Sequence, residues 1–192
     1  MKTICIIPAR SGSTRIPNKN IKLFHGKPII AYSIENALNS KLFDDIYVST
    51  DSGVASNIAL SYGINVIVRP PELAVNEIGT QDVLRHACIH LGLANDDLVM
   101  GMYATCPLLP PDAIVESLAQ LIKNNFMFVF TANPSNQDIG ALYWGRAWAF
   151  KGGLPLSHWG EPRYTPDKYC CDINTPEDWT RAEQMYEELD GH

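Results

Sequence analysis

The sequence lacks long hydrophobic runs, CxxC pairs and any excess of basic residues. No apolar run approaches the roughly 20 residues that a membrane-spanning helix needs, so we expect no membrane partner. The N-terminus enters a short β-like run and meets Pro8 and Arg10, which is not the pattern of a signal peptide. The five cysteines, two of them adjacent, fit the reduced thiols of a cytoplasmic protein. With 15 lysines and arginines against 21 aspartates and glutamates, the net charge is −6, and we expect no nucleic-acid partner.

The length and the apolar content predict one globular domain. A chain of 192 residues that is 46% hydrophobic can bury a core without disulfides or structural metals. No internal repeat, low-complexity tract or linker interrupts it. We therefore expect a single domain over residues 1–192.

Strand-like and helix-like segments alternate along the chain. The expected strands are Thr3–Pro8, Asp45–Thr50, Asn65–Val68, Leu98–Tyr103, Met127–Thr131, Gly140–Trp144 and Lys168–Cys171. Five helices are expected. The first begins at Pro28, the second ends at about Tyr62 and the third covers Gln81–Leu91. The fourth contains Ile114, Leu118, Leu121 and Ile122, and the fifth begins at Pro176 with Thr175 as its N-cap. This order predicts an α/β fold with a doubly wound, mostly parallel sheet and helices on both faces. In such sheets, ligands bind beyond the carboxyl ends of the strands.

The loop after the first expected strand concentrates positive charge in an otherwise acidic chain. Ala9–Asn20 reads ARSGSTRIPNKN and contains Arg10, Arg15 and Lys19 among small residues. Small residues let backbone N–H groups approach an anion, and the cations neutralise it, so the loop is suited to a phosphorylated ligand. It is neither a Walker A loop nor a GxGxxG fingerprint. A solvated basic turn is the alternative interpretation.

Residues 6–21 (IIPARSGSTRIPNKNI) resemble the N-terminal signature of the acylneuraminate cytidylyltransferases, the CMP-sialic acid synthetases. Later segments agree in order along the chain: 48–51 (VSTD), 69–74 (RPPELA), 103–109 (YATCPLL), 140–145 (GALYWG) and 172–179 (DINTPEDW). The YATCPLL and YWG versions are most similar to the pseudaminic-acid branch of that family. The resemblance implies a Rossmann-like nucleotidyltransferase fold.

The resemblance also implies an activity. Family members transfer CMP from CTP to the anomeric hydroxyl of an eight- or nine-carbon sugar acid and release pyrophosphate. CTP and a sugar-acid substrate are therefore the expected partners, with Mg²⁺ as the cofactor. Nucleotidyl transfer depends mainly on positioning and on neutralising phosphate charge.

The resemblance assigns expected roles to particular residues. The implied catalytic residues are Arg10, Lys19 and Asp172. The implied nucleotide-binding residues are Ala9, Arg10, Ser11, Gly12, Ser13, Lys19, Asn20, Arg69, Thr80, Ala104, Thr105 and Pro107. The implied sugar contacts are Tyr103 and Asp138, and the implied metal ligands are Asp172 and Asn174.

The spacing of the metal pair has its own physical basis. Residues 172 and 174 point the same way from an extended backbone, so their oxygens can share one Mg²⁺ with substrate phosphates. In the alternative interpretation, Asp172 caps a turn and Asn174 merely precedes a helix.

Three departures from the family pattern set this chain apart. Thr14 stands where the signature usually has lysine, and Arg15 replaces that charge only if it points inward. Asn174 replaces the second carboxylate of the metal pair, and Val75-Asn76 replaces an acidic pair. The long arm that exchanges contacts with a second subunit is reduced to residues 131–137 (TANPSNQ). We therefore expect a monomer or a different homo-oligomer, and not the arm-exchanged dimer.

Other interpretations remain open at this point. The departures favour a weak or inactive relative that binds nucleotide or sugar, and a transferase for another sugar or nucleotide is a third alternative. His86 and His90, spaced i, i+4, are a candidate metal pair without a third ligand, so helix-surface histidines are the simpler interpretation. Cys106 is a candidate nucleophile, but no paired histidine is indicated and a small buried residue fits better.

Overall fold

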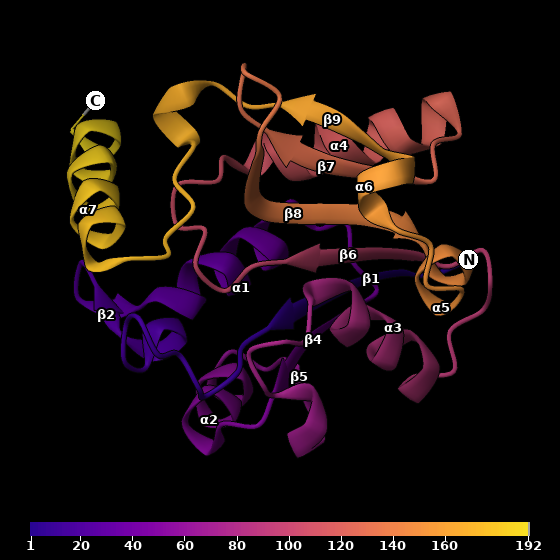
Figure 1. Ribbon diagram of the computed structural model, residues 1–192, viewed down its shortest axis with the longest axis horizontal. Coiled ribbons are helices and arrows are strands. Elements are labelled where there is room, and N and C mark those ends of the chain that lie inside the picture. The colour runs from indigo at the N-terminus through magenta and orange to yellow at the C-terminus, as the bar shows by residue number, and fades with distance from the viewer. Residues whose placement is uncertain (192) are drawn as a thin grey trace.

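The computed structural model describes residues 1–191 and contains a seven-stranded central sheet (Figure 1). Its strand order is β5-β4-β1-β6-β8-β7-β9, and only β8 runs antiparallel to its neighbours. The strands are β1 (Thr3–Pro8), β4 (Asp45–Thr50), β5 (Asn65–Val68), β6 (Leu98–Met102), β7 (Phe128–Ala132), β8 (Asp138–Arg146) and β9 (Gly160–Tyr164). The predicted mostly parallel α/β sheet is confirmed.

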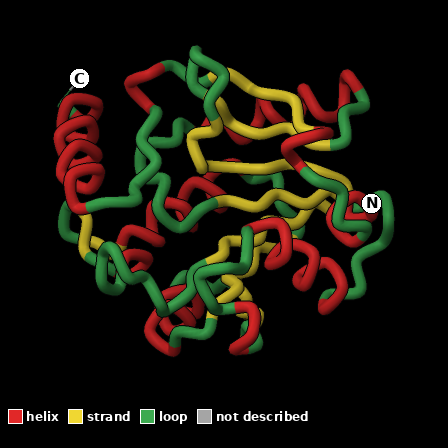
Figure 2. Tube along the Cα trace, in the orientation of Figure 1, coloured by secondary structure: helices red, strands yellow, loops and turns green. Residues whose placement is uncertain are grey.

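Helices cover both faces of the sheet, as Figure 2 shows. They are α1 (Ile29–Ser40), α2 (Gly53–Ser61), α3 (Thr80–His90), α4 (Pro111–Asn124), α5 (Ala147–Lys151), α6 (Leu156–Trp159) and α7 (Pro176–Asp190). Short elements complete the chain: the 3₁₀ turns Lys19–Ile21, Pro71–Leu73 and Asp167–Tyr169, and the hairpin strands β2 (Leu23–Phe24) and β3 (Lys27–Pro28). No helix within residues 1–191 has both the length and the apolar character needed to cross a membrane.

Strand β1 shows why the sheet needs two helical layers. Successive side chains of a strand point to opposite faces, so a continuous apolar run must be buried on both sides. Ile7 packs with Ile34 of α1 on one face, whereas Ile6 packs with Leu84 of α3 on the other. Burying one such side chain contributes about 1.5–3 kcal/mol. The same burial holds the carboxyl end of β1, and the loop that follows it, in a fixed place.

Helix α7 packs outside the sheet, beside the β2–β3 hairpin and on the side of the molecule away from the N-terminus (Figure 1). Trp179 and Phe24 meet edge to face with ring centroids 5.6 Å apart. Thr175 caps α7 through a reciprocal capping box with Asp178, which confirms the predicted start of this helix. This docking carries the segment Asp172–Asn174 to the loop that follows β1.

The predicted strand at Lys168–Cys171 is wrong. Pro166 lacks an N–H, and the backbone turns into the 3₁₀ segment Asp167–Tyr169, whose end is closed by the Cys170 N–H bonded to the Asp167 carbonyl at 2.9 Å. The seventh strand is instead β9, which pairs in parallel with β7 and was not predicted.

The connection between β7 and β8 is short. The Asn133 N–H donates to the Gln137 carbonyl and the Asn136 N–H to the Asn133 carbonyl, each at 2.9 Å. Asn136 adopts a left-handed conformation with φ of 65°, which asparagine tolerates well. Residues 131–137 thus close a hairpin at the place where the resemblance expects a long arm.

Candidate functional site

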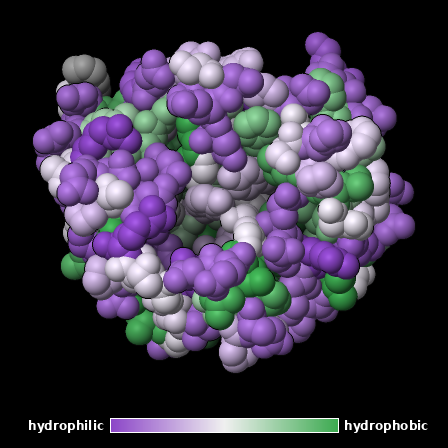
Figure 3. Space-filling model, in the orientation of Figure 1, coloured by the Kyte–Doolittle hydropathy of each residue, from purple (hydrophilic) through white to green (hydrophobic). Residues whose placement is uncertain are grey.

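A cavity of about 510 Å³ lies beyond the carboxyl ends of β1, β5 and β6, and we call it the cationic cavity. Hydrophilic residues surround the hollow on this face of the molecule (Figure 3). Its lining within residues 1–191 is Pro8, Arg10, Ser13, Thr14, Arg15, Lys19, Asn20, Arg69, Asn76, Ile78, Gly79, Thr80, Val83, Tyr103, Ala104, Thr105 and Asn174. This lining holds four cations and neither aspartate nor glutamate. The cationic cavity is therefore suited to a polyanion.

Arg69 is the most deeply placed of these cations, with only 4% of its surface exposed. It follows β5, and its Nη2 donates to the Ser49 carbonyl at 2.6 Å. Burial lowers the pKa of Arg69 to about 10, so the guanidinium stays charged at neutral pH. Among the described residues it forms no ion pair within 4.0 Å. A buried charge without a partner is costly, and an anionic ligand in the cavity offsets that cost.

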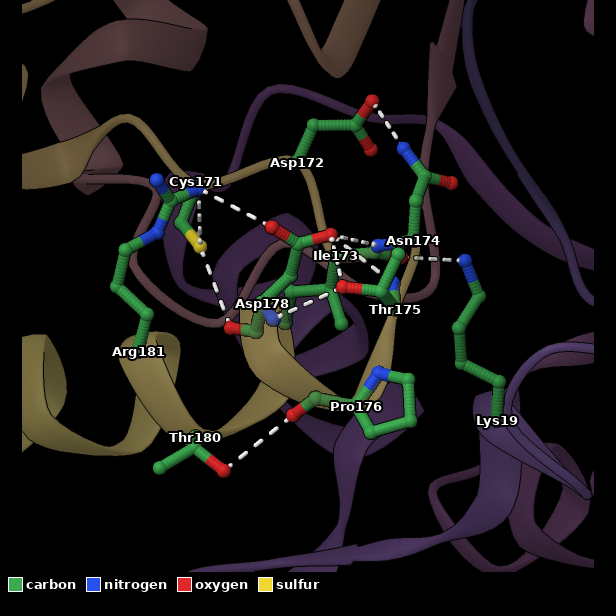
Figure 4. A network of polar contacts seen from close by, with 10 residues as sticks. All are labelled: Lys19, Cys171, Asp172, Ile173, Asn174, Thr175, Pro176, Asp178, Thr180 and Arg181. Carbon is green, nitrogen blue, oxygen red and sulfur yellow. Dashed lines mark hydrogen bonds and ion pairs between the residues drawn. The ribbon is translucent and has the colours of Figure 1, made fainter.

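Lys19 and Arg15 connect the loop after β1 to the segment before α7 (Figure 4 shows the Lys19 contact). The Lys19 ammonium donates to the Ile173 carbonyl at 2.6 Å, and Arg15 Nη2 donates to Asn174 Oδ1 at 3.2 Å. Burial lowers the pKa of Lys19, although the nearby Asp172 carboxylate opposes this shift. Arg15 points inward, so it supplies a cation beside Thr14, where the usual lysine is missing.

Asp172 and Asn174 lie side by side, as the spacing predicts. Asn174 Nδ2 donates to Asp172 Oδ2 at 2.6 Å, so both side chains face the same space (Figure 4). Burial raises the pKa of Asp172, while the hydrogen bond from Asn174 and the charge of Lys19 act against this rise.

The Asp172 carboxylate fits a hard divalent cation, whereas Asn174 turns its Nδ2 toward Asp172 and its Oδ1 toward Arg15, so this amide must turn over before its oxygen can join Asp172 in binding a metal. Mg²⁺ is commonly held by one or two carboxylates together with substrate phosphates and water. Gly140, at φ of +59°, leaves the space open, because a Cβ there would lie 3.2 Å from the Asp172 carboxyl group. Within residues 1–191 no cluster of three or more histidines, cysteines or acidic side chains could hold a metal.

A second cavity of about 730 Å³ adjoins the first, and we call it the side groove. The two share Gly79, Thr80 and Tyr103 in their linings. A chain of hydroxyl groups crosses this boundary: Thr80 donates to the Tyr103 hydroxyl at 3.0 Å, and Tyr143 donates to Asp138 at 2.8 Å. The two tyrosine hydroxyls lie 3.5 Å apart. Desolvation raises the pKa of Asp138.

The structure brings together most of the predicted site residues. Those that line the cationic cavity are Arg10, Ser13, Lys19, Asn20, Arg69, Thr80, Tyr103, Ala104, Thr105 and Asn174, while Tyr103 and Asp138 line the side groove. Asp172 reaches the cationic cavity through its contact with Asn174.

Four predicted nucleotide contacts lie outside the cavity linings: Ala9, Ser11, Gly12 and Pro107. Ser11 faces Asp51, whose carboxylate accepts both the Ser11 N–H, at 2.8 Å, and its hydroxyl. Burial alone would raise the pKa of Asp51, but these hydrogen bonds outweigh it and lower the pKa. Ala9 is buried, and its carbonyl accepts the Thr50 hydroxyl. Ser11 and Ala9 therefore stabilise the conformation of the loop without lining the cavity.

Asn76 is a lining residue that the sequence did not reveal. Its side-chain oxygen accepts a hydrogen bond from Arg10, across 66 positions of sequence. The only sign of Asn76 in the sequence was that Val75-Asn76 replaces an acidic pair of the family pattern. An acidic side chain at this place would form an ion pair with Arg10, whereas the amide leaves the guanidinium charge uncompensated.

The structure supports neither Cys106 as a nucleophile nor His86 and His90 as a metal pair. Burial raises the pKa of the Cys106 thiol to about 12, so it stays protonated at neutral pH. The His86 and His90 rings stack with centroids 5.6 Å apart, which does not aim two nitrogens at a common point.

Comparison with known proteins decides the family. A sequence model described as cytidylyltransferase matches residues 4–139. A pseudaminic acid cytidylyltransferase of Campylobacter jejuni is 35% identical over an alignment that covers 97% of each chain. The chain belongs to the cytidylyltransferase family. That alignment spans 225 positions against 192 residues here, so the relative contains segments that this cytidylyltransferase lacks.

Further comparisons extend the likeness. An N-acylneuraminate cytidylyltransferase of Streptococcus agalactiae is 48% identical over 87 residues, which are 44% of this chain and 21% of that protein. A CMP:2-keto-3-deoxy-manno-octonic acid synthetase solved with CTP superimposes with a TM-score of 0.80 at 16% identity, covering 98% of this chain and 100% of the other. A Mycobacterium tuberculosis protein solved with manganese gives 0.67 at 14% identity, covering 96% and 99%. These structures show the shared Rossmann-like fold.

Proposed function

We propose that the chain transfers CMP from CTP to a nine-carbon sugar acid, pseudaminic acid being the first candidate, and releases pyrophosphate. The main support for this proposal is the cationic cavity at the carboxyl ends of three parallel strands, where Arg69 is buried and forms no ion pair with any residue of 1–191. The full-length similarity to a pseudaminic acid cytidylyltransferase supports the choice of acceptor. We propose that residues 1–192 act as one domain in the cytoplasm.

The residues around the two cavities have different proposed roles in the transfer. Arg10, Lys19 and Arg69 neutralise the phosphates, with Ser13 and Asn20 beside them, while Ala104, Thr105 and Thr80 line the base and ribose region. Asp172, with the Asn174 amide turned over, would hold Mg²⁺, which on binding would neutralise phosphate charge. In-line attack of the acceptor hydroxyl on the α-phosphorus forms the new P–O bond and breaks the bond to the pyrophosphate leaving group. Tyr103 and Asp138 orient the acceptor at the boundary of the side groove.

A pyrophosphate-release assay tests the proposal. The purified chain is mixed with CTP, Mg²⁺ and either pseudaminic acid, N-acetylneuraminic acid or an octulosonic acid. We expect acceptor-dependent release, fastest with a nine-carbon acid. Measurable CTP binding without release for any acceptor would reject the transferase and favour the weak or inactive relative. Asn174, which brings no charge to the metal pair, is the observation that favours this second candidate.

The short β7–β8 connection supports a proposal for the oligomeric state. Residues 131–137 fold back as a hairpin and do not form the extended arm that the family resemblance leads us to expect. We propose a monomer, or a homo-oligomer of different geometry. Light scattering at assay concentrations measures this directly.

Lys19 predicts an alkaline limit to nucleotide binding. Burial lowers its pKa below the ordinary value of 10.5, so as pH rises its charge is lost earlier than that of an exposed lysine. We expect the Kd for CTP, measured without metal, to rise with pH above neutrality. Lys19→Arg keeps the charge and is expected to move this rise to higher pH. An unchanged pH profile in the variant would remove Lys19 from the phosphate site.

Tyr143→Phe tests the hydroxyl chain between the cavities. The substitution removes the donor to Asp138 while preserving the ring that packs in the core. Since the lost hydrogen bond to a charged group is worth about 1.5–3 kcal/mol, we expect the acceptor KM to rise roughly ten-fold, with little change in the KM for CTP. Equal changes in both KM values would show that Tyr143 supports the fold and not the acceptor.

A further inference from the structure

The two cavities differ sharply in charge. The cationic cavity carries Arg10, Arg15, Lys19 and Arg69, whereas the side groove carries one cation, Arg85, with Asp82 and Asp138. An anionic acceptor therefore gains electrostatic energy only if its carboxylate turns toward the cationic cavity. The part of the acceptor that enters the side groove must be uncharged or nearly so.

Resting on the proposed function, we propose that the far end of the side groove binds the N-acyl-bearing tail of the acceptor, with Arg85 donating to the acyl carbonyl. The acceptor's carboxylate and its reacting hydroxyl sit on the same carbon, so both belong at the boundary with the cationic cavity. The opposite end of a nine-carbon chain then extends along α3, away from the reaction.

The position of Arg85 on α3 fits a contact with this tail. The helix begins at Thr80, on the boundary between the cavities, and Arg85 follows five residues later. At a rise of 1.5 Å per residue, this places Arg85 about 7.5 Å farther along the helix axis. That distance is too long for the reacting carbon and suits the distal part of the acceptor.

The Arg85 guanidinium is free to bind a ligand. It makes no hydrogen bond or ion pair with any residue in the part of the chain that the structure describes. Its Nη1 lies 3.8 Å from the place that a Cβ of Gly153 would occupy, so the glycine leaves this side of the group uncovered. Asp82, one turn earlier on α3, offsets its charge within the groove. Together these features favour a neutral carbonyl over a second anion.

The surrounding walls fit a methyl group beside that carbonyl. Phe130, Phe150, Leu156 and Pro162 line the groove from β7, α5, α6 and β9. Gln81 connects α3 to the wall that contains Leu156. Its amide donates to the Leu154 carbonyl at 2.9 Å and accepts the Leu156 N–H at 3.1 Å. An apolar wall beside an unpaired donor suits an acylamino group, whose methyl packs on the wall while its carbonyl accepts from Arg85.

The test compares one nine-carbon acid in its N-acylated and N-deacylated forms with the wild type and Arg85→Ala. For the acylated acid we expect the variant to raise KM about ten-fold, as for the loss of one charge-assisted hydrogen bond, with the KM for CTP unchanged. The deacylated acid carries an ammonium group that the Arg85 charge repels, so there the variant is expected to lower KM. Changes of the same sign in the KM for both acids, or an unchanged KM for both, would overturn the assignment. Lys123→Ala, on α4 and outside both linings, is the matched charge control.

A second pair of variants tests the groove without touching Arg85. Ser157 lines the side groove and His158, the next residue of α6, does not. Ser157→Trp is expected to weaken acceptor binding at least ten-fold and His158→Trp to leave it unchanged, measured calorimetrically with a non-hydrolysable CTP analogue present. Equal binding by both variants would overturn the assignment. Arg85-dependent binding without pyrophosphate release would reject the proposed transfer and support the groove, whereas release that is indifferent to Arg85 and Ser157 would reject the groove alone.

Discussion

Asp172→Asn is expected to lower kcat by roughly 10²–10³-fold, the scale of losing one preorganised electrostatic contact to the transition state. Asparagine preserves the size and one oxygen, so the contact with Asn174 survives, while the carboxylate charge that would bind Mg²⁺ on the proposed function is lost. Turnover is measured by pyrophosphate release at saturating CTP over a range of Mg²⁺ concentrations. We expect that added Mg²⁺ restores only part of the rate.

Two controls accompany this result. Metal-free CTP binding is expected to stay within a few-fold of wild type, because the cations of the cavity remain in place. Asp112→Asn, in the first turn of α4 and outside both cavities, removes a carboxylate of the same kind and is expected to leave kcat unchanged. An Asp172→Asn enzyme with normal kcat and normal Mg²⁺ dependence would remove Asp172 from the catalytic group.

Asn174→Asp is expected to tighten Mg²⁺ binding about ten-fold or more, since it adds a second carboxylate to a hard cation. The new charge also meets Arg15, whose Nη2 already donates to the Asn174 oxygen. Without metal, two neighbouring carboxylates at 172 and 174 repel one another, so the melting temperature is expected to fall and to recover when Mg²⁺ is added. Titration of the nucleotide complex with Mg²⁺ and thermal melts with and without the metal provide the measurements.

The turnover rate of Asn174→Asp shows whether the natural amide limits catalysis. Faster turnover in Asn174→Asp at low Mg²⁺ would show that the natural amide limits metal occupancy. Unchanged metal affinity would contradict the placement of Asn174 as a ligand. The conservative Asn174→Gln separates the two effects, because it keeps the amide but moves the oxygen by one methylene group.

Local patterns in the sequence predicted the sheet and the loop after β1. The continuous apolar run Thr3–Pro8 requires burial on both faces, and only a central strand provides it. Thr175-Pro176 predicted the start of α7 because cap chemistry is local. Arg10 and Lys19 were predicted from the cationic loop that follows a buried strand, whereas Arg69 was implied by the family resemblance alone.

Long-range contacts explain what the sequence did not reveal. Lys168–Cys171 looked like a strand, but Pro166 and the 3₁₀ turn at Asp167 separate it from any partner. Edge strand β9 has little apolar alternation, and only its pairing with β7 defines it. Asn76 joins the site through a contact that no spacing rule anticipates.

The short hairpin after β7 does not line the cationic cavity of this cytidylyltransferase. The cations that do so follow β1 and β5: Arg10, Arg15, Lys19 and Arg69. Arg15 lines the cavity beside Thr14, where the family signature usually has lysine. On the proposed function, these four cations contact the phosphates.

³¹P NMR of the chain with CTP, Mg²⁺ and pseudaminic acid measures the proposed transfer most directly. We predict that the CTP signals are replaced by one phosphodiester signal of a CMP-sugar and by pyrophosphate in equal amounts, with Arg85→Ala slowing the conversion at low acceptor concentration. CTP signals that persist at high protein concentration, or that yield CMP without a sugar phosphodiester, would contradict it.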